Sequence, residues 1–297
     1  MLWLALFVMQ DETALLAARV AASPRLTLER TEVRVAVQGL GFPSAVTMDA
    51  QGQIYVLQRE EKLAPVMVVD AAGQVLRSWG QGLYKIPHSI RLDPQGNVWT
   101  VDSSNSQVHK FTSQGEKLMT IDVGGQPNNG SAFNGTTDIA FAPNGQLYIS
   151  DGYGNARVLV YTPDGKKVRE WGKAGTGPGE FNQPHGIAID NGVVYVADRK
   201  NGRLQRFNLA GKFLGEWAGL GMVTSVSAHG GAIWIGTQQR SEPTSADGWI
   251  LKLDRRTGKI LGHTESAHGH HCVNLSGGQV LSGARPDHVY RWLYRRK

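Results

Sequence analysis

The sequence holds a single cysteine, Cys272, so no intramolecular disulfide stabilises the fold. It has no run of about 20 apolar residues, which excludes an ordinary transmembrane helix. The net charge is +6, but the basic residues form no nucleic-acid-binding motif, and the basic C-terminal end is typical of a solvated tail. We therefore expect neither a nucleic-acid partner nor a stable membrane span.

Glycine is abundant, with 37 residues, whereas proline is scarce, with 12. Glycine enrichment without low complexity indicates many tight turns, as in an all-β protein built from short strands. The hydrophobic share of 41% is large enough for an extensive core.

The N-terminal residues form an apolar segment that allows two interpretations. Met1–Met9 is strongly apolar but lacks the positive charges that open a secretory signal, while residues 17–22 offer the small side chains that signal peptidase accepts. If Met1–Ala22 acts as a signal peptide, the protein is secreted or periplasmic; otherwise it is cytoplasmic. We assign residues 1–27 to this segment and residues 28–297 to one folded domain.

One sequence motif recurs six times along that domain. It consists of an apolar strand, a turn rich in Asn, Gln and Gly, and a second apolar strand. The copies begin at Val46, Ile90, Ile139 and Ile187, with weaker ones at Val226 and Val273. A second hairpin follows in most copies, so each unit contains four strands within roughly 40 to 50 residues. This period predicts a six-bladed β-propeller.

The last unit has only three strands and ends near the C-terminus. Near the start of the chain, residues 32–37 alternate polar and apolar side chains and belong to no copy. We expect this segment to supply the outer strand of the sixth blade and to close the ring, which removes the exposed edges of an open sheet.

The residues just before each inner strand should ring one mouth of the central channel. The residues at this equivalent position in the six repeats are Ser44, His88, Thr137, His185, Thr224 and His271. The histidines fall in alternate blades, about 120° apart in a six-fold ring, so three imidazoles can converge on one metal ion. For the third ligand, His268 and His270 are alternatives to His271. Zinc suits neutral imidazoles, with iron or copper as alternatives.

The loops after the second strands supply further polar residues at the same mouth. At matching phase they place Arg59, Ser103, Gly152, Arg199, Gln238 and Arg285, and Tyr153 follows Gly152. Arginine suits bidentate binding of a carboxylate, and a tyrosine near a metal can transfer a proton. We name Arg59, Tyr153 and Arg199 as candidate catalytic residues. The structural alternative is that these arginines cap neighbouring blades.

Two phrases resemble the NHL repeat, namely residues 148–152 (YISDG) and 195–203 (YVADRKNGR). This resemblance spans about Leu40 to Lys297 and implies NHL-type blades.

Three longer stretches resemble the peptidyl-α-hydroxyglycine α-amidating lyase family: residues 84–102, 150–158 and 179–203. Members of that family have a six-bladed propeller and a zinc ion held by three histidines, with an arginine and a tyrosine beside it. They split a peptidyl-α-hydroxyglycine into a peptide amide and glyoxylate.

The resemblance implies that His88, His185 and His271 bind zinc and that Arg59 and Tyr153 are catalytic. It also implies a small or peptide-like hydroxylated substrate with a carboxylate. The family has an aspartate that helps hold calcium where this chain has Cys272, which argues against calcium here. The alternatives are a metal-dependent hydrolase or lactonase, which favours acidic metal ligands, and a non-catalytic binding platform.

Overall fold

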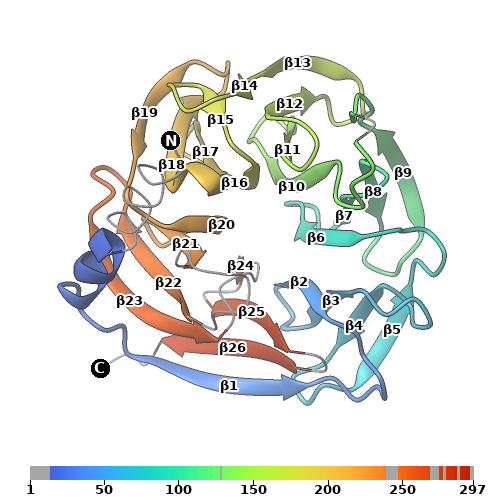
Figure 1. Cartoon of the computed structure of the whole chain (residues 1–297). Helices are drawn as coiled ribbons and strands as arrows, with labels where there is room; N and C mark the ends of the chain where they lie inside the picture. The colour runs from blue at the N-terminus through green and yellow to red at the C-terminus, as the bar shows by residue number, and fades with distance from the viewer. Residues whose placement is uncertain are drawn as a thin grey trace.

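The computed structural model describes residues 14–127, 129–238, 247–267, 274–276, 279–285 and 288–294. Within these residues, six four-stranded antiparallel sheets surround a central axis (Figure 1). Each sheet is one blade, with its first strand innermost. The predicted all-β propeller is therefore confirmed.

The blades follow one another along the chain. Blades one and two consist of β2 (Pro43–Met48), β3 (Ile54–Gln58), β4 (Val66–Val69), β5 (Val75–Trp79), β6 (Pro87–Leu92), β7 (Val98–Asp102), β8 (Gln107–Phe111) and β9 (Lys117–Asp122). Blades three and four consist of β10 (Thr136–Phe141), β11 (Leu147–Asp151), β12 (Arg157–Tyr161), β13 (Lys167–Trp171), β16 (Pro184–Asp190), β17 (Val193–Asp198), β18 (Arg203–Asn208) and β19 (Phe213–Trp217). Blades five and six consist of β20 (Met222–His229), β21 (Ala232–Gln238), β22 (Asp247–Asp254), β23 (Ile260–Ala267), β24 (Asn274–Ser276), β25 (Gln279–Arg285), β26 (His288–Tyr294) and β1 (Leu28–Arg34). A short parallel pair, β14 (Lys173–Ala174) and β15 (Glu180–Phe181), and the 3₁₀ turn η1 (Arg199–Asn201) border blade four.

The ring is closed by the N-terminal strand β1. It pairs antiparallel with β26 along its whole length, with Glu32 opposite Tyr290, and becomes the outer strand of blade six (Figure 1). The closure predicted from the sequence is confirmed. The strand begins at Leu28, earlier than the alternation indicated, and the Ala36 N–H instead donates to the Gly73 carbonyl of blade one.

The residues before β1 pack on the outside of blades four and five. A helix over residues 14–21 buries Leu16 and Val20 in an apolar cluster formed by those two blades. Arg19 donates hydrogen bonds to the carbonyls of Ala218 and Gly219. No helix among the described residues is long and apolar enough to cross a membrane.

The core lies between facing blades. Its apolar clusters join blade four to blade five through Tyr195 and Ile233, and blade six to blade one through Leu281 and Val56. Burial of one such side chain contributes about 1.5–3 kcal/mol to the free energy of folding. Because the clusters run from blade to blade, the inner strands have little freedom to shift, and residues that face the channel keep fixed positions.

One buried histidine lies within a blade, away from the channel. His109 is fully buried in blade two; its Nδ1 is 3.0 Å from Thr120 Oγ1, and its ring packs edge-on against Tyr84. Burial lowers the pKa of His109 from 6.5 to about 4. The unfolded chain therefore takes up a proton at a higher pH than the folded chain does.

From this shift we expect the free energy of unfolding to decrease as the pH falls from about 6.5 to about 4, with His109 contributing up to about 3 kcal/mol. His109→Gln should remove that part of the decrease, because glutamine does not titrate. Urea unfolding at several pH values measures the effect. An identical pH dependence in wild type and variant would contradict it.

Candidate metal centre and active site

A β-bulge lies at the start of each inner strand that is described completely. The pairing register between first and second strands shifts at one position in each of blades one to five, and the skipped positions include Ser44, His88, Thr137, His185 and Thr224. A bulge bends its strand and redirects the side chain of the extra residue. The ring of residues predicted at the channel mouth therefore consists of bulge residues.

The hydroxyl residues of this ring stabilise the bulges. Ser44, Thr137 and Thr224 each donate a hydrogen bond to a carbonyl of the second strand, at Leu57, Ser150 and Gly236. These carbonyls hold equivalent places in the three blades. The hydroxyl groups of blades one, three and five thus satisfy backbone groups that the shifted register exposes.

The carbonyls of the same hydroxyl residues orient the two described histidines. His88 Nδ1 lies 2.6 Å from the Thr137 carbonyl oxygen, and His185 Nδ1 lies 2.5 Å from the Thr224 carbonyl oxygen. A carbonyl only accepts, so each Nδ1 carries the proton and each Nε2 presents its lone pair. Each histidine is therefore held in one tautomer by the next blade of the ring.

The two Nε2 atoms meet at Tyr153. Its hydroxyl oxygen lies 3.0 Å from His88 Nε2 and 3.1 Å from His185 Nε2, and the two imidazole centroids are 4.9 Å apart. One hydroxyl proton can be donated to only one of these acceptors at a time. Two inward lone pairs at one point are two of the three protein ligands that a catalytic zinc ion usually has, so the chemistry of these two residues fits part of a zinc site.

Both histidines are almost fully buried, with exposed fractions of 3% for His88 and 2% for His185. Burial, together with the positive charges of Arg59 and Arg199, lowers the pKa of His88 from 6.5 to about 3. His88 is therefore neutral, and available as a ligand, throughout the physiological pH range.

Arg59 lies beside His88, where the sequence predicted it. Its Nε donates to the carbonyl of Pro87, and its guanidinium lies over the rings of Phe42 and Phe133, 5.6 and 5.3 Å from their centroids. The Phe133 ring also packs against Tyr153, with centroids 5.0 Å apart. The two phenylalanines thus form an apolar rim around a positive charge.

Arg199 approaches Tyr153 from blade four. Arg199 is half-buried. Burial lowers the pKa of its guanidinium, while a hydrogen bond with Tyr153 opposes that change. Its Nη1 also lies 3.5 Å from Gln183 Oε1. Gln183 adopts a left-handed backbone conformation with φ 65°, which is rare for residues other than glycine. Backbone strain of this kind is often found at functional sites.

Two glycines allow neighbouring blades to approach at the site. A Cβ at Gly152 would overlap the carbonyl of Pro184, and a Cβ at Gly186 would lie 2.7 Å from the Ser225 Cα. Gly152 precedes Tyr153, and Gly186 follows His185. Glycine at these two positions therefore permits the close packing that brings tyrosine and histidine together.

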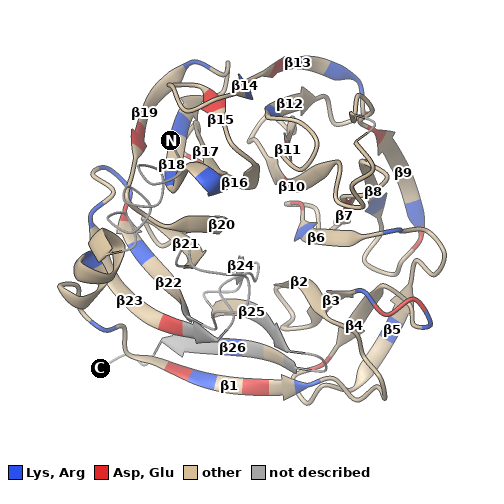
Figure 2. Cartoon of the chain, in the orientation of Figure 1, with Lys and Arg blue, Asp and Glu red and all other residues tan. Residues whose placement is uncertain are grey.

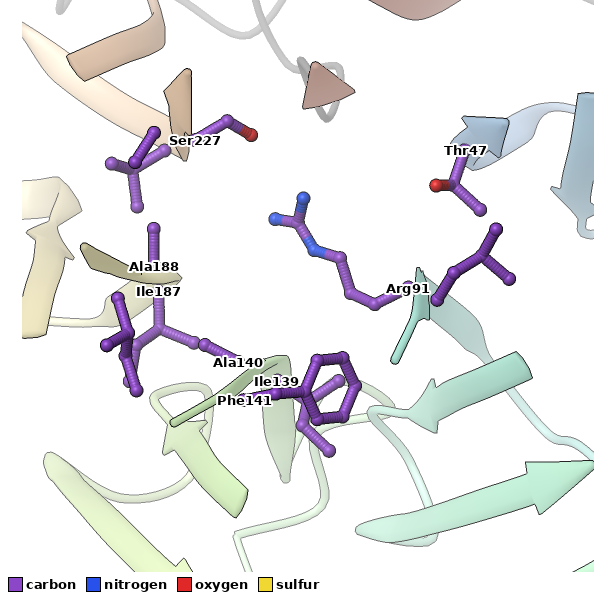
Figure 3. Close-up of a pocket in the computed structure, with 12 residues that line it drawn as sticks. Thr47, Arg91, Ile139, Ala140, Phe141, Ile187, Ala188 and Ser227 are labelled. Atoms are coloured by element: carbon purple, nitrogen blue, oxygen red, sulfur yellow. The ribbon is translucent and has the colours of Figure 1, made fainter. Parts of the chain in front are cut away.

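Below the histidines, an ion pair lies beside the channel. Arg91 binds Asp138 through two hydrogen bonds, from Nε to Oδ1 at 3.0 Å and from Nη2 to Oδ2 at 2.6 Å. Asp138 also accepts from Ser89 and from the backbone N–H of Ile187, so it links blades two, three and four. Figure 3 shows the Arg91 side chain extending into the channel cavity of about 250 Å³ on this side.

The structure brings together five of the six predicted site residues: His88, His185, Arg59, Tyr153 and Arg199. The sixth, His271, lies outside the described residues, as do His268, His270 and Cys272. In the described part of the chain, no group of three or more His, Cys, Asp or Glu side chains is placed to hold a metal. The third ligand therefore remains a prediction, and so does the expectation that Cys272 disfavours a calcium site.

Several functional features were missed from the sequence. The carbonyls of Thr137 and Thr224 orient the histidines, but a backbone acceptor leaves no mark on residue identity. Phe42 and Phe133 contact Arg59 from two separate loops. Phe42 could have been noticed two residues before Ser44, at the same mouth. Phe133 could also have been noticed, because it stands four residues before Thr137, as Phe181 stands four residues before His185.

Comparisons with known proteins agree with this architecture. A family model described as a 6-bladed beta-propeller matches residues 132–219, and an NHL repeat model matches residues 85–111. The solved structure of a streptogramin B lyase has a TM-score of 0.64 and 13% identity, with 90% of this chain and 98% of that chain covered. Identity this low shows a shared fold alone.

Among curated proteins, peptidyl-glycine alpha-amidating monooxygenase B of Xenopus laevis is 35% identical over 153 residues, which is 48% of this chain and 18% of that protein. Peptidyl-alpha-hydroxyglycine alpha-amidating lyase 1 of Drosophila melanogaster is 33% identical over 204 residues, which is 57% of this chain and 38% of that protein. The chain thus spans less than half the length of either relative.

Proposed function

We propose that this chain, an NHL-repeat β-propeller that resembles the peptidyl-α-hydroxyglycine α-amidating lyases, is a zinc-dependent carbon–nitrogen lyase. Its substrate is a carbinolamide that carries a carboxylate, and its products are an amide and glyoxylate. The observation that carries the proposal is the meeting of two Nε2 lone pairs at the Tyr153 hydroxyl, with the charges of Arg59 and Arg199 close to His88.

His88 and His185 would hold the zinc ion through Nε2, with His271 of blade six as the third ligand. The described pattern supports this choice, because each histidine donates its Nδ1–H to a carbonyl of the next blade. Blade one follows blade six in the closed ring. The Ser44 carbonyl would therefore be the acceptor for the Nδ1–H of His271, as the Thr137 and Thr224 carbonyls are for the other two histidines. When bound, zinc supplies a Lewis acid that lowers the pKa of the substrate α-hydroxyl.

Tyr153 is placed to move the proton. Its oxygen lies where the two imidazole lone pairs converge, so a substrate hydroxyl bound there comes within hydrogen-bond reach of it. With Tyr153 in its phenolate form, the substrate hydroxyl proton passes to the tyrosine oxygen, the carbon–oxygen double bond forms and the carbon–nitrogen bond breaks. The tyrosine hydroxyl then gives that proton to the amide nitrogen, which restores the phenolate. Atoms and charges balance without another reactant. Arg199, which forms a hydrogen bond with Tyr153, would hold the tyrosine oxygen in place during this exchange.

Arg59 would bind the carboxylate that leaves as glyoxylate. Its Nε is already engaged by the Pro87 carbonyl, which fixes the plane of the guanidinium beside His88. The rings of Phe42 and Phe133 lie 5.6 and 5.3 Å from this guanidinium and would lower the local dielectric constant, which strengthens its attraction for an anion.

The proposal predicts one equivalent of zinc in the purified protein and glyoxylate release from α-hydroxyhippurate, a simple carbinolamide. Metal analysis and a glyoxylate assay measure the two. Zinc without glyoxylate would contradict the lyase and leave the hydrolase or lactonase as the enzyme alternative. Absence of both zinc and glyoxylate, after incubation with zinc, would favour a binding platform.

A further inference from the structure

A groove of about 490 Å³ opens beside Tyr153, between blades three and four. Its walls are the loop 152–157, the β14–β15 segment and η1, and six side chains define its chemistry: Tyr153, Asn155, Asn182, Gln183, Lys173 and Lys200. Tyr153 and Gln183 also belong to the candidate active site. The groove is therefore continuous with the place where the proposed reaction occurs.

The floor of the groove offers an amide group for a peptide backbone. Asn182 is held from both sides, because its N–H donates to Asp198 and its carbonyl accepts from the Lys200 N–H. Its side chain is exposed in the groove. The Asn155 amide, by contrast, is engaged by Gly125 and Asp151. A side-chain amide both donates and accepts, which suits a peptide unit.

Two of the three basic side chains that line the groove are paired with carboxylates. Arg157 is paired with Asp151 and Glu170, and Lys173 lies 3.2 Å from Glu180. Lys200 is exposed, and no ion pair or side-chain hydrogen bond involves it among the residues that the structure describes. Figure 2 shows basic segments in blue around β14 and β16. The groove therefore presents a positive charge one residue away from Arg199.

We propose that this groove binds the substrate residue that precedes the hydroxyglycine and that Lys200 selects an acidic side chain there. The inference rests on the proposed lyase function, since it uses the continuity of the groove with Tyr153. The amide product of the reaction then carries a carboxylate at its last residue, and the natural substrate class is an acidic peptide or acyl-amino acid.

The test compares kcat/KM for N-acetyl-Glu-α-hydroxyglycine with that for its Gln counterpart. We expect the wild-type protein to prefer the glutamyl substrate by about threefold to fivefold, the range of an exposed ion pair. Lys200→Met should bring the ratio to about one, and Lys200→Glu should invert it, because charge attraction becomes repulsion. Lys212→Glu is the matched control: Lys212 lies in the same blade, in the turn between β18 and β19, and should keep the wild-type ratio.

A binding measurement separates the groove from the reaction. Calorimetric titration with N-acetyl-Glu-Gly, which lacks the hydroxyl, should give a weaker affinity in Lys200→Glu than in wild type or Lys212→Glu. Equal affinities, or an unchanged glutamyl preference in the Lys200 variants, would overturn the groove assignment. Absence of glyoxylate from every carbinolamide would instead contradict the proposed function, and the titration would still decide the groove.

Discussion

His185→Ala is expected to abolish zinc binding and to reduce glyoxylate release by about a thousandfold or more, because the metal would lose one of three ligands and its position at the channel mouth. The fold should survive. The substitution removes the hydrogen bond from Nδ1 to the Thr224 carbonyl, which costs about 1–3 kcal/mol for a buried pair, and the contact of Nε2 with the Tyr153 hydroxyl. Zinc content, glyoxylate rate and thermal unfolding measure the three effects.

The control for this variant is His229→Ala, since His229 is exposed at the far end of β20 and should leave zinc and rate unchanged. One equivalent of zinc in purified His185→Ala would refute the ligand assignment. Should that variant fail to fold, His185→Gln keeps a polar side chain beside the Thr224 carbonyl. Folded His185→Gln with full zinc and full rate would refute the assignment equally.

Tyr153→Phe is expected to lower kcat by about 10²–10⁴-fold while zinc stays bound, because the variant loses the proton-transfer group and keeps both imidazoles. The phenylalanine ring can retain the contact with Phe133, where the wild-type ring centroids are 5.0 Å apart. Pre-steady-state glyoxylate formation, together with metal analysis, separates the chemical step from metal loss.

Tyr161→Phe is the control, because Tyr161 ends β12 and is buried away from the site. Its rate should match that of the wild-type protein. A Tyr153→Phe variant that keeps full kcat would show that the hydroxyl carries no proton. Loss of zinc in that variant would show instead that Tyr153 serves the metal.

The repeat made most of this molecule predictable. Each copy encodes one blade, and the phase of the copies aligns residues that lie far apart in the sequence, such as His88 and His185. Their meeting in the structure follows from the ring symmetry and needs no local motif. The N-terminal strand was predictable for a related reason, because only an alternating segment outside the copies could complete a three-stranded blade.

The details that set the chemistry were not predictable in the same way. The bulges at His88 and His185 arise from a shift in pairing, which depends on both strands and on the neighbouring blade. The tautomers depend on backbone carbonyls. The pairing of Arg91 with Asp138 joins different copies at positions where the repeat does not specify polar residues. Such contacts depend on three-dimensional packing more than on the sequence pattern.

The pairing of β1 with β26 determines when the site can form during synthesis. The Thr31 hydroxyl bonds the carbonyl of Arg291, across 260 positions of sequence. Contacts between residues so far apart in the sequence form late in folding, because the entropic cost of closing the long loop between them must be overcome first. A ribosome-bound nascent chain thus carries blades but not yet a ring. The proposed third ligand belongs to the sixth unit in chain order, so the metal centre would assemble only after that unit has left the ribosome.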